Sequence, residues 1–99
     1  MSAETTTAKH AIHDALESQI KTAEAKLETL KARAEVAKAT LEIKAIAELT
    51  TKRLEIHQKL QELKKAEDKN WERMKADLEV KIASFEKSVK SIEEKVKAH

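Results

Sequence analysis

The chain contains no cysteine, glycine or proline, and its aromatic residues are a single Trp and a single Phe among 99 residues. The absence of cysteine excludes disulfides, thiolate catalysis and Cys-based zinc sites. Glycine and proline are the residues that most often mark turns. Without them, we expect long regular elements whose ends must be found from other signals.

The chain also lacks a strong charge of one sign and any long apolar run. Its 20 Lys and Arg residues nearly balance 18 Asp and Glu residues, which leaves a net charge of +2. No segment has the one-signed field that nucleic acid requires, so nucleic acid is not an expected partner. No apolar run reaches the roughly 18 residues of a membrane span. The first residues also lack the order of a signal peptide. We expect a soluble cytoplasmic protein.

Charged residues make up 38% of the chain, and the hydrophobic 40% is mostly Ala, Leu, Ile and Val. Such a composition is typical of long helices and coiled coils. A chain of this length forms one domain at most. We therefore predict a single helical or coiled-coil domain over residues 1–99.

Apolar residues recur at steps of three and four along almost the whole chain, which predicts an all-α fold of long amphipathic helices. Over 84 residues the pattern takes 23 steps, or about 3.65 residues per step, close to an undistorted helix. Only Arg53 and Glu67 interrupt this stripe. Its members are Ile12, Leu16, Ile20, Ala23, Leu27, Leu30, Ala34, Ala37, Leu41, Ala45, Leu49, Ile56, Leu60, Leu63, Trp71, Met74, Leu78, Ile82, Phe85, Val89, Ile92 and Val96.

The least helical stretch is residues 66–74, AEDKNWERM, where Asp68 and Asn70 are suited to cap a helix start. We predict a helix over 8–66, a turn over 67–70 and a helix over 71–97. An antiparallel hairpin is favoured over a continuous coiled-coil rod. A three-helix bundle with another break near Thr40 is the third arrangement.

A second apolar row supports the hairpin, because a helix with two apolar rows needs more than one neighbour. The row runs beside the stripe only in the middle of the chain, where residues 71–96 would pack on residues 40–65. Residues 8–35 have a single stripe, so we expect them to project and to pair with another subunit, in a homo-oligomer that is a dimer or tetramer. The second row consists of Val36, Ala39, Ile43, Ala47 and Leu54, with Ile46 between the two rows.

The only grouping that suggests a metal is His10, His13 and Asp14, since imidazole and carboxylate on one helix face can bind Zn, Ni or Cu. Solvated polar residues near a helix end are the simpler interpretation. We expect no metal and no other cofactor.

Three residues are candidates for structural roles. Trp71 is expected to anchor the corner of the hairpin, and Glu67 is expected to lie at that corner. Arg53 is expected to fix register by pairing with Glu67 or with a carboxylate of a partner, or else to extend its stem over apolar surface. Ser84, Ser88 and Ser91 have no adjacent base to activate them, and we expect no enzymatic activity.

The segment around Trp71 resembles a family of small bacterial coiled-coil proteins linked to stress response. The resemblance covers mainly residues 56–90, and it implies a stress-linked role without catalytic residues. It is carried by Leu60-x-x-Leu63-Lys64-x-Ala66, by Trp71-Glu72-x-Met74-Lys75, and by Leu78 and Phe85.

Two functional hypotheses follow. The first is a non-enzymatic, self-associating coiled-coil protein with a stress-linked structural or interaction role, for which an additional, unidentified protein partner is considered. The alternative is a peripheral binder of lipid or membrane surfaces through the amphipathic helix 71–96. That helix carries as many as six acidic residues, which disfavours strong binding to anionic lipid.

Overall fold

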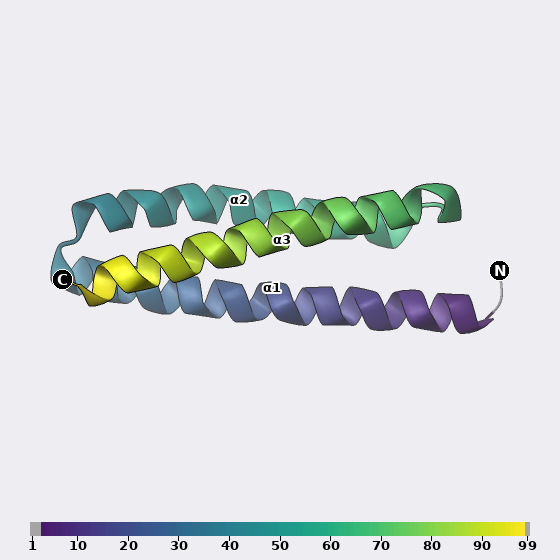
Figure 1. Ribbon diagram of the computed structural model, residues 1–99, viewed down its shortest axis with the longest axis horizontal. Helices are drawn as coiled ribbons and strands as arrows, with labels where there is room; N and C mark the ends of the chain where they lie inside the picture. Colours follow the sequence, from purple (N-terminus) through teal and green to yellow (C-terminus); the bar gives the residue numbers. More distant parts are fainter. Residues whose placement is uncertain (1–2, 99) are drawn as a thin grey trace.

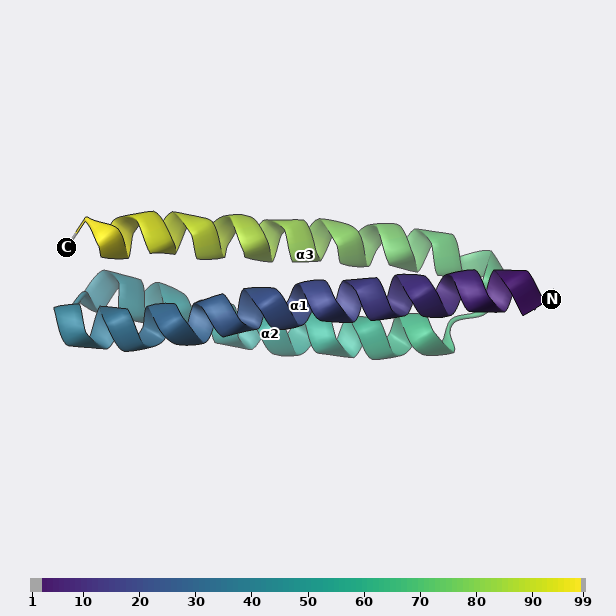
Figure 2. The same cartoon turned by 90° about the horizontal axis from the view of Figure 1, so that it is seen from below.

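The computed structural model describes residues 3–98, with side chains described from residue 8 onward. Over this range the chain forms three α-helices and no strand: α1 (Ala3–Ala37), α2 (Thr40–Lys65) and α3 (Asp68–Lys97). They lie side by side in an elongated bundle of 53 × 17 × 15 Å, in which α1 and α3 run one way and α2 runs the other (Figures 1 and 2). The predicted all-α class is confirmed.

The turn before Trp71 lies slightly earlier than predicted. Ala66 and Glu67 are extended, with ψ of 144° and 156°, and form a two-residue link between α2 and α3. Glu67 is the capping residue of α3, and its carbonyl accepts hydrogen bonds from the backbone N–H groups of Asn70 and Trp71 at 3.0 Å. Asp68 and Asn70, predicted as caps, therefore lie inside the first turn of α3. Beyond the link, α2 and α3 form the antiparallel hairpin.

The helix predicted over 8–66 is split, because α1 ends at Ala37 and the chain reverses there too. Lys38 takes a left-handed conformation with φ of 56°. The N–H of Ala39 donates to the carbonyl of Ala34 at 2.9 Å, and the N–H of Lys38 donates to the carbonyl of Glu35 at 3.2 Å. These two bonds form a Schellman motif, which normally places glycine where Lys38 stands. The break near Thr40, stated as the third arrangement, is therefore the one observed, although lysine occupies the position where glycine is usual.

Within each helix the buried residues follow alternating steps of three and four. In α1, the advance of 21 positions from His13 to Ala34 takes six steps, or 3.5 residues per step. This is the heptad spacing of left-handed coiled-coil packing. The average of about 3.65 residues per step along the whole stripe is larger because that count runs across the two turns. At the first turn the core positions shift, so that Ile46 is buried and Leu41 is 79% exposed.

Residues 8–35 do not project from the hairpin, contrary to the prediction, because the turn at Lys38 folds α1 back along it. α1 contacts both α2 and α3, and its apolar stripe is buried within the same chain. The second neighbour that α2 required is therefore α1. The buried residues of α1 are His13, Leu16, Ile20, Ala23, Leu27, Leu30 and Ala34.

The core is unevenly filled along the bundle. Its largest fully buried side chains are Leu60, Leu63, Leu78 and Ile82, which come from the parts of α2 and α3 nearer the second turn. Burial of each contributes about 1.5–3 kcal/mol. Toward the first turn the core includes the small residues Ala34 and Ala39.

Candidate functional site

The most distinctive polar site lies where the first turns of α1 meet the start of α3. Trp71 is 4% exposed, and its indole Nε1–H donates a hydrogen bond to Nε2 of His13 at 3.2 Å. The two ring centroids are 6.0 Å apart. Because Nε2 accepts this bond, it carries no proton, and the hydrogen of the neutral imidazole is on Nδ1. The contact joins residues 58 positions apart in the chain.

The surroundings of His13 favour this neutral form. Burial lowers the pKa of His13, and the positive charges of His10, Lys64 and Lys9 lower it further, against an opposing effect of Asp14. Loss of solvation disfavours the charged imidazolium, as do nearby positive charges. A neutral His13 is the form that the indole hydrogen bond requires.

Two lysines lie near the indole ring of Trp71. The ammonium of Lys9 lies 5.2 Å from the ring centroid and that of Lys75 lies 6.0 Å from it, within the range of cation–π contacts. Lys9 also forms an ion pair with Asp68 in the first turn of α3, and Lys64 of α2 pairs with Glu17 of α1 at 3.5 Å. These contacts hold α1 against the second turn.

An open cleft of about 350 Å³ lies at this site. His10, His13 and Asp14, the candidate metal ligands, are among its lining residues. The rings of His10 and His13 meet edge to face at 6.2 Å, and Nε2 of His13 is occupied by the indole hydrogen bond. Among the residues with described side chains, no group of three or more His, Asp or Glu residues could hold a metal ion.

A second polar cluster joins α1 to α2. The carboxylate of Glu24 forms an ion pair with Arg53 Nη1 at 3.3 Å, and it also lies 2.6 Å from His57 Nε2. Glu24 and Arg53 are half-buried, and the Nε of Arg53 is buried without a hydrogen-bond partner. Arg53, predicted to pair with Glu67 or a carboxylate of a partner, thus pairs with Glu24 of its own chain. Glu67 stays exposed at the second turn.

Glu24, Lys9 and Lys64 complete these two clusters, but sequence patterns did not single out Glu24 or Lys9, and Lys64 entered only through the resemblance. Each lies on a different helix from the residue it contacts, and the pairs are separated by at least 29 positions. Such pairing follows only once the first turn is known. The interruption of the stripe at Arg53 was the one available signal, since a charged residue at a core position needs a nearby carboxylate.

Both clusters join side chains of different helices. His13 and His57 are each engaged with a side chain of another helix. The hydroxyls of Ser84 and Ser88 line a separate recess between α2 and α3, with Lys52, Lys81 and Glu55. The apolar face of α3 that the lipid-binding alternative requires is buried, since Ile82, Phe85 and Val89 are at most 4% exposed.

None of the helices in the described part of the chain is long and apolar enough to cross a membrane. Comparison with known proteins found no matching family model, no matching curated protein and no matching solved structure.

Proposed function

We propose that this chain is a non-enzymatic, self-associating helical protein with a structural or interaction role linked to stress. One observation carries the self-association: α2 keeps an exposed apolar row after its core face is covered. Ile43 is 37% exposed and Leu54 is 61% exposed, with the exposed Ala47 and Thr50 between them. The steps of four, three and four are those of a helix-pairing seam.

A second copy of the chain fits this row. If two α2 helices pair antiparallel about a point between Ala47 and Thr50, Ile43 of each copy faces Leu54 of the other. The small central residues allow close approach. The row spans 11 residues, about 17 Å, which is short for a stable interface. We therefore expect a weak dimer that forms as concentration rises.

Two further observations support the remaining parts of the proposal. The histidines are engaged in contacts between helices, His13 with Trp71 and His57 with Glu24, which suits a structural role. The stress link rests on the resemblance over residues 56–90 alone. That segment includes the second turn with Trp71 and most of the α2–α3 hairpin.

Sedimentation equilibrium tests the proposed self-association. The wild-type chain is expected to shift from monomer toward dimer with rising concentration, whereas Ile43→Glu with Leu54→Glu is expected to stay monomeric. The control is Leu41→Glu with Val80→Glu, which replaces two residues outside the row that are 79% and 68% exposed. It should associate like the wild type.

A wild-type chain that is monomeric throughout would contradict the proposal. So would a control that loses association as completely as the row variant. The far-ultraviolet circular dichroism of each variant should match that of the wild type, because all four substituted side chains are already exposed.

A further inference from the structure

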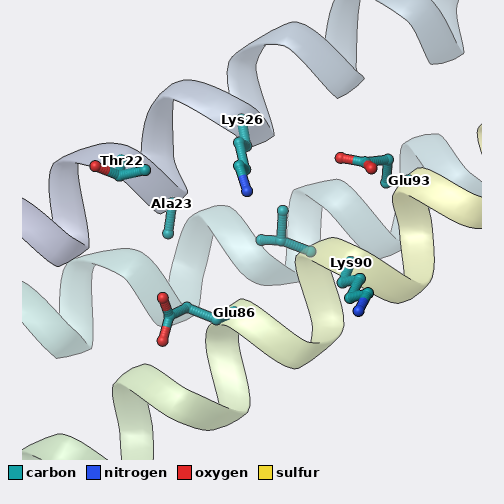
Figure 3. A pocket seen from close by; sticks show the side chains of 7 residues that line it. Thr22, Ala23, Lys26, Glu86, Lys90 and Glu93 are labelled. Carbon is teal, nitrogen blue, oxygen red and sulfur yellow. The ribbon is translucent and has the colours of Figure 1, made fainter.

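A continuous groove runs between the C-terminal halves of α1 and α3. Three adjoining recesses of about 300, 560 and 340 Å³ make it up. The first two share Thr22, Lys26 and Glu93 as lining residues, and the last two share Arg33 and Lys97. Figure 3 shows the first recess, with side chains of α1 on one side and of α3 on the other.

The floor of the groove is apolar, whereas its walls are mostly polar and charged. Ala23 and Val89 line its first recess, Leu30 lines the second, and Val36 and Val96 line the third. Additional small residues on the α1 side let another backbone come close. From Thr22 to Ala37 the groove is about 22 Å long, which matches roughly four helical turns. The additional small residues are Thr22, Ala25, Thr29, Ala32 and Ala37.

The rim of the groove carries unpaired positive charge. Among the ion pairs between described side chains, Lys26, Arg33 and Lys90 have no carboxylate partner. Of the two acidic residues of the rim, Glu93 pairs with Lys97 at 3.3 Å, whereas Glu86 accepts a hydrogen bond from the neutral amide of Gln19 at 2.8 Å and keeps its negative charge. In Figure 3 the side chain of Lys26 extends from α1 over the recess. The groove therefore presents three cations and one uncompensated carboxylate around an apolar floor, so that its rim is positive on balance.

We propose that this groove binds an acidic amphipathic helix of another protein, which packs on α1 and α3 as the fourth helix of a bundle. Its apolar side chains would lie over Leu30 and Val89, and its carboxylates would reach Lys26, Arg33 and Lys90. Helix-in-groove binding of this kind combines apolar anchors with charges at the rim. No residue of α2 lines the groove, so the inference does not depend on self-association through Ile43 and Leu54.

Fluorescence anisotropy with the full chain tests the groove. The probe is a labelled amphipathic peptide of about 15 residues, with leucine at heptad positions and glutamate on both flanks. The control probe has every glutamate replaced by lysine. The acidic peptide is expected to bind and the basic peptide is expected not to bind, because the rim of the groove is positive.

Charge reversal locates the binding. Lys26→Glu, Arg33→Glu and Lys90→Glu together should weaken binding of the acidic peptide by about tenfold or more. The matched control reverses Lys44, Lys69 and Arg73, exposed cations outside the groove, and should bind within about twofold of the wild type. Thr29→Trp, which fills the groove without changing charge, should also weaken binding.

Several outcomes would overturn the proposal. The acidic peptide could fail to bind the wild type, the basic peptide could bind equally well, or the two triple variants could weaken binding equally. In a fourth outcome, charge reversal in the groove would dissociate a homodimer while the acidic peptide would bind neither the wild type nor the variants. The occupant of the groove would then be a second copy of the chain. Circular dichroism checks that each variant keeps its helices, as expected for substitutions of exposed side chains.

Discussion

The indole N–H of Trp71 hydrogen-bonds to Nε2 of His13, which ties the start of α3 to the N-terminal part of α1. The bond exists only while Nε2 is unprotonated, because an imidazolium has donors on both ring nitrogens. Trp71 was expected to anchor the corner of a hairpin. In the structure the same residue also links that corner to α1.

Stability is predicted to fall in mild acid because of His13. The pKa of His13 in the folded chain lies below the ordinary value of 6.5, chiefly through burial. The unfolded chain therefore binds more protons between the two pKa values. The contribution of His13 to the free energy of unfolding is complete above pH 6.5 and is lost as the pH falls through 6.5 toward the lower, folded-state pKa.

Urea unfolding between pH 7.5 and pH 5.5 measures this effect. His13→Gln keeps a hydrogen-bond acceptor for Trp71 but does not titrate. Most of the fall in the free energy of unfolding with decreasing pH should therefore be absent in this variant. His10→Gln, one turn away, should show a decline that is smaller than that of the wild type, because the charge of His10 helps to lower the pKa of His13. An unchanged decline in His13→Gln would show that another group is responsible.

The ion pair between Glu24 and Arg53 is predicted to couple α1 to α2. In a double-mutant cycle with alanine at both positions, we expect a coupling energy of about 0.5–1 kcal/mol, reduced by salt because both groups are partly exposed. The comparison is the pair Glu93–Lys97 within α3, in which Lys97 is exposed and Glu93 is half-buried, with an expected coupling of about 0.3–0.5 kcal/mol. Zero coupling between Glu24 and Arg53 would mean that their pairing does not help to hold the two helices in register.

Replacement of Lys38 by glycine is predicted to stabilise the chain. The left-handed conformation of Lys38 costs a residue with a Cβ atom roughly 1–2 kcal/mol, and glycine avoids that cost. After the greater entropy of glycine in the unfolded chain is subtracted, we expect a gain of about 0.5–1 kcal/mol in the free energy of unfolding. Urea unfolding gives this value directly.

Lys31→Gly is the matched control, since Lys31 is an exposed residue inside α1. It should destabilise the chain by about 1 kcal/mol, the usual cost of glycine in a helix interior. If Lys38→Gly were equally destabilising, residue 38 would lie within a continuous helix and the first turn would not exist.

Periodicity predicted most of the fold, because an amphipathic stripe depends on side chains that are near one another in sequence. The second turn was predicted within a few residues, since polar residues precede Trp71 and a core position falls on Glu67. The first turn was not favoured, because a Schellman motif normally contains glycine and here contains Lys38. The sequence offered Thr40 as a possible break, but Leu41 was counted on the core stripe, whereas in the structure Leu41 is exposed and Ile46 is buried.

The polar clusters were much less predictable. Whether His13 meets Trp71, or Arg53 meets Glu24, depends on the register of α1 against the other two helices. That register is set by both turns together. The sequence showed a histidine near a helix end and an arginine on an apolar stripe, but the contacts that explain each of them arise only from the folded chain.

The central structural claim is that α1 folds back on α2 within one chain, and a distance between spin labels tests it most directly. Ser18 of α1 and Gln61 of α2 are exposed, and the chain has no cysteine to interfere with labelling of Ser18→Cys with Gln61→Cys. The nearby Glu17–Lys64 ion pair places the two sites at similar levels along the bundle.

Pulsed electron spin resonance should be measured on doubly labelled chains diluted with unlabelled protein, so that distances between copies do not contribute. Adjacent helix axes lie about 8–10 Å apart. When the reach of the side chains and of the labels is added, the bundle predicts a main distance between labels of about 15–30 Å. A continuous helix over 8–66 would separate the two sites by roughly 65 Å, at 1.5 Å for each of 43 residues. A dominant distance near that value would contradict the three-helix bundle.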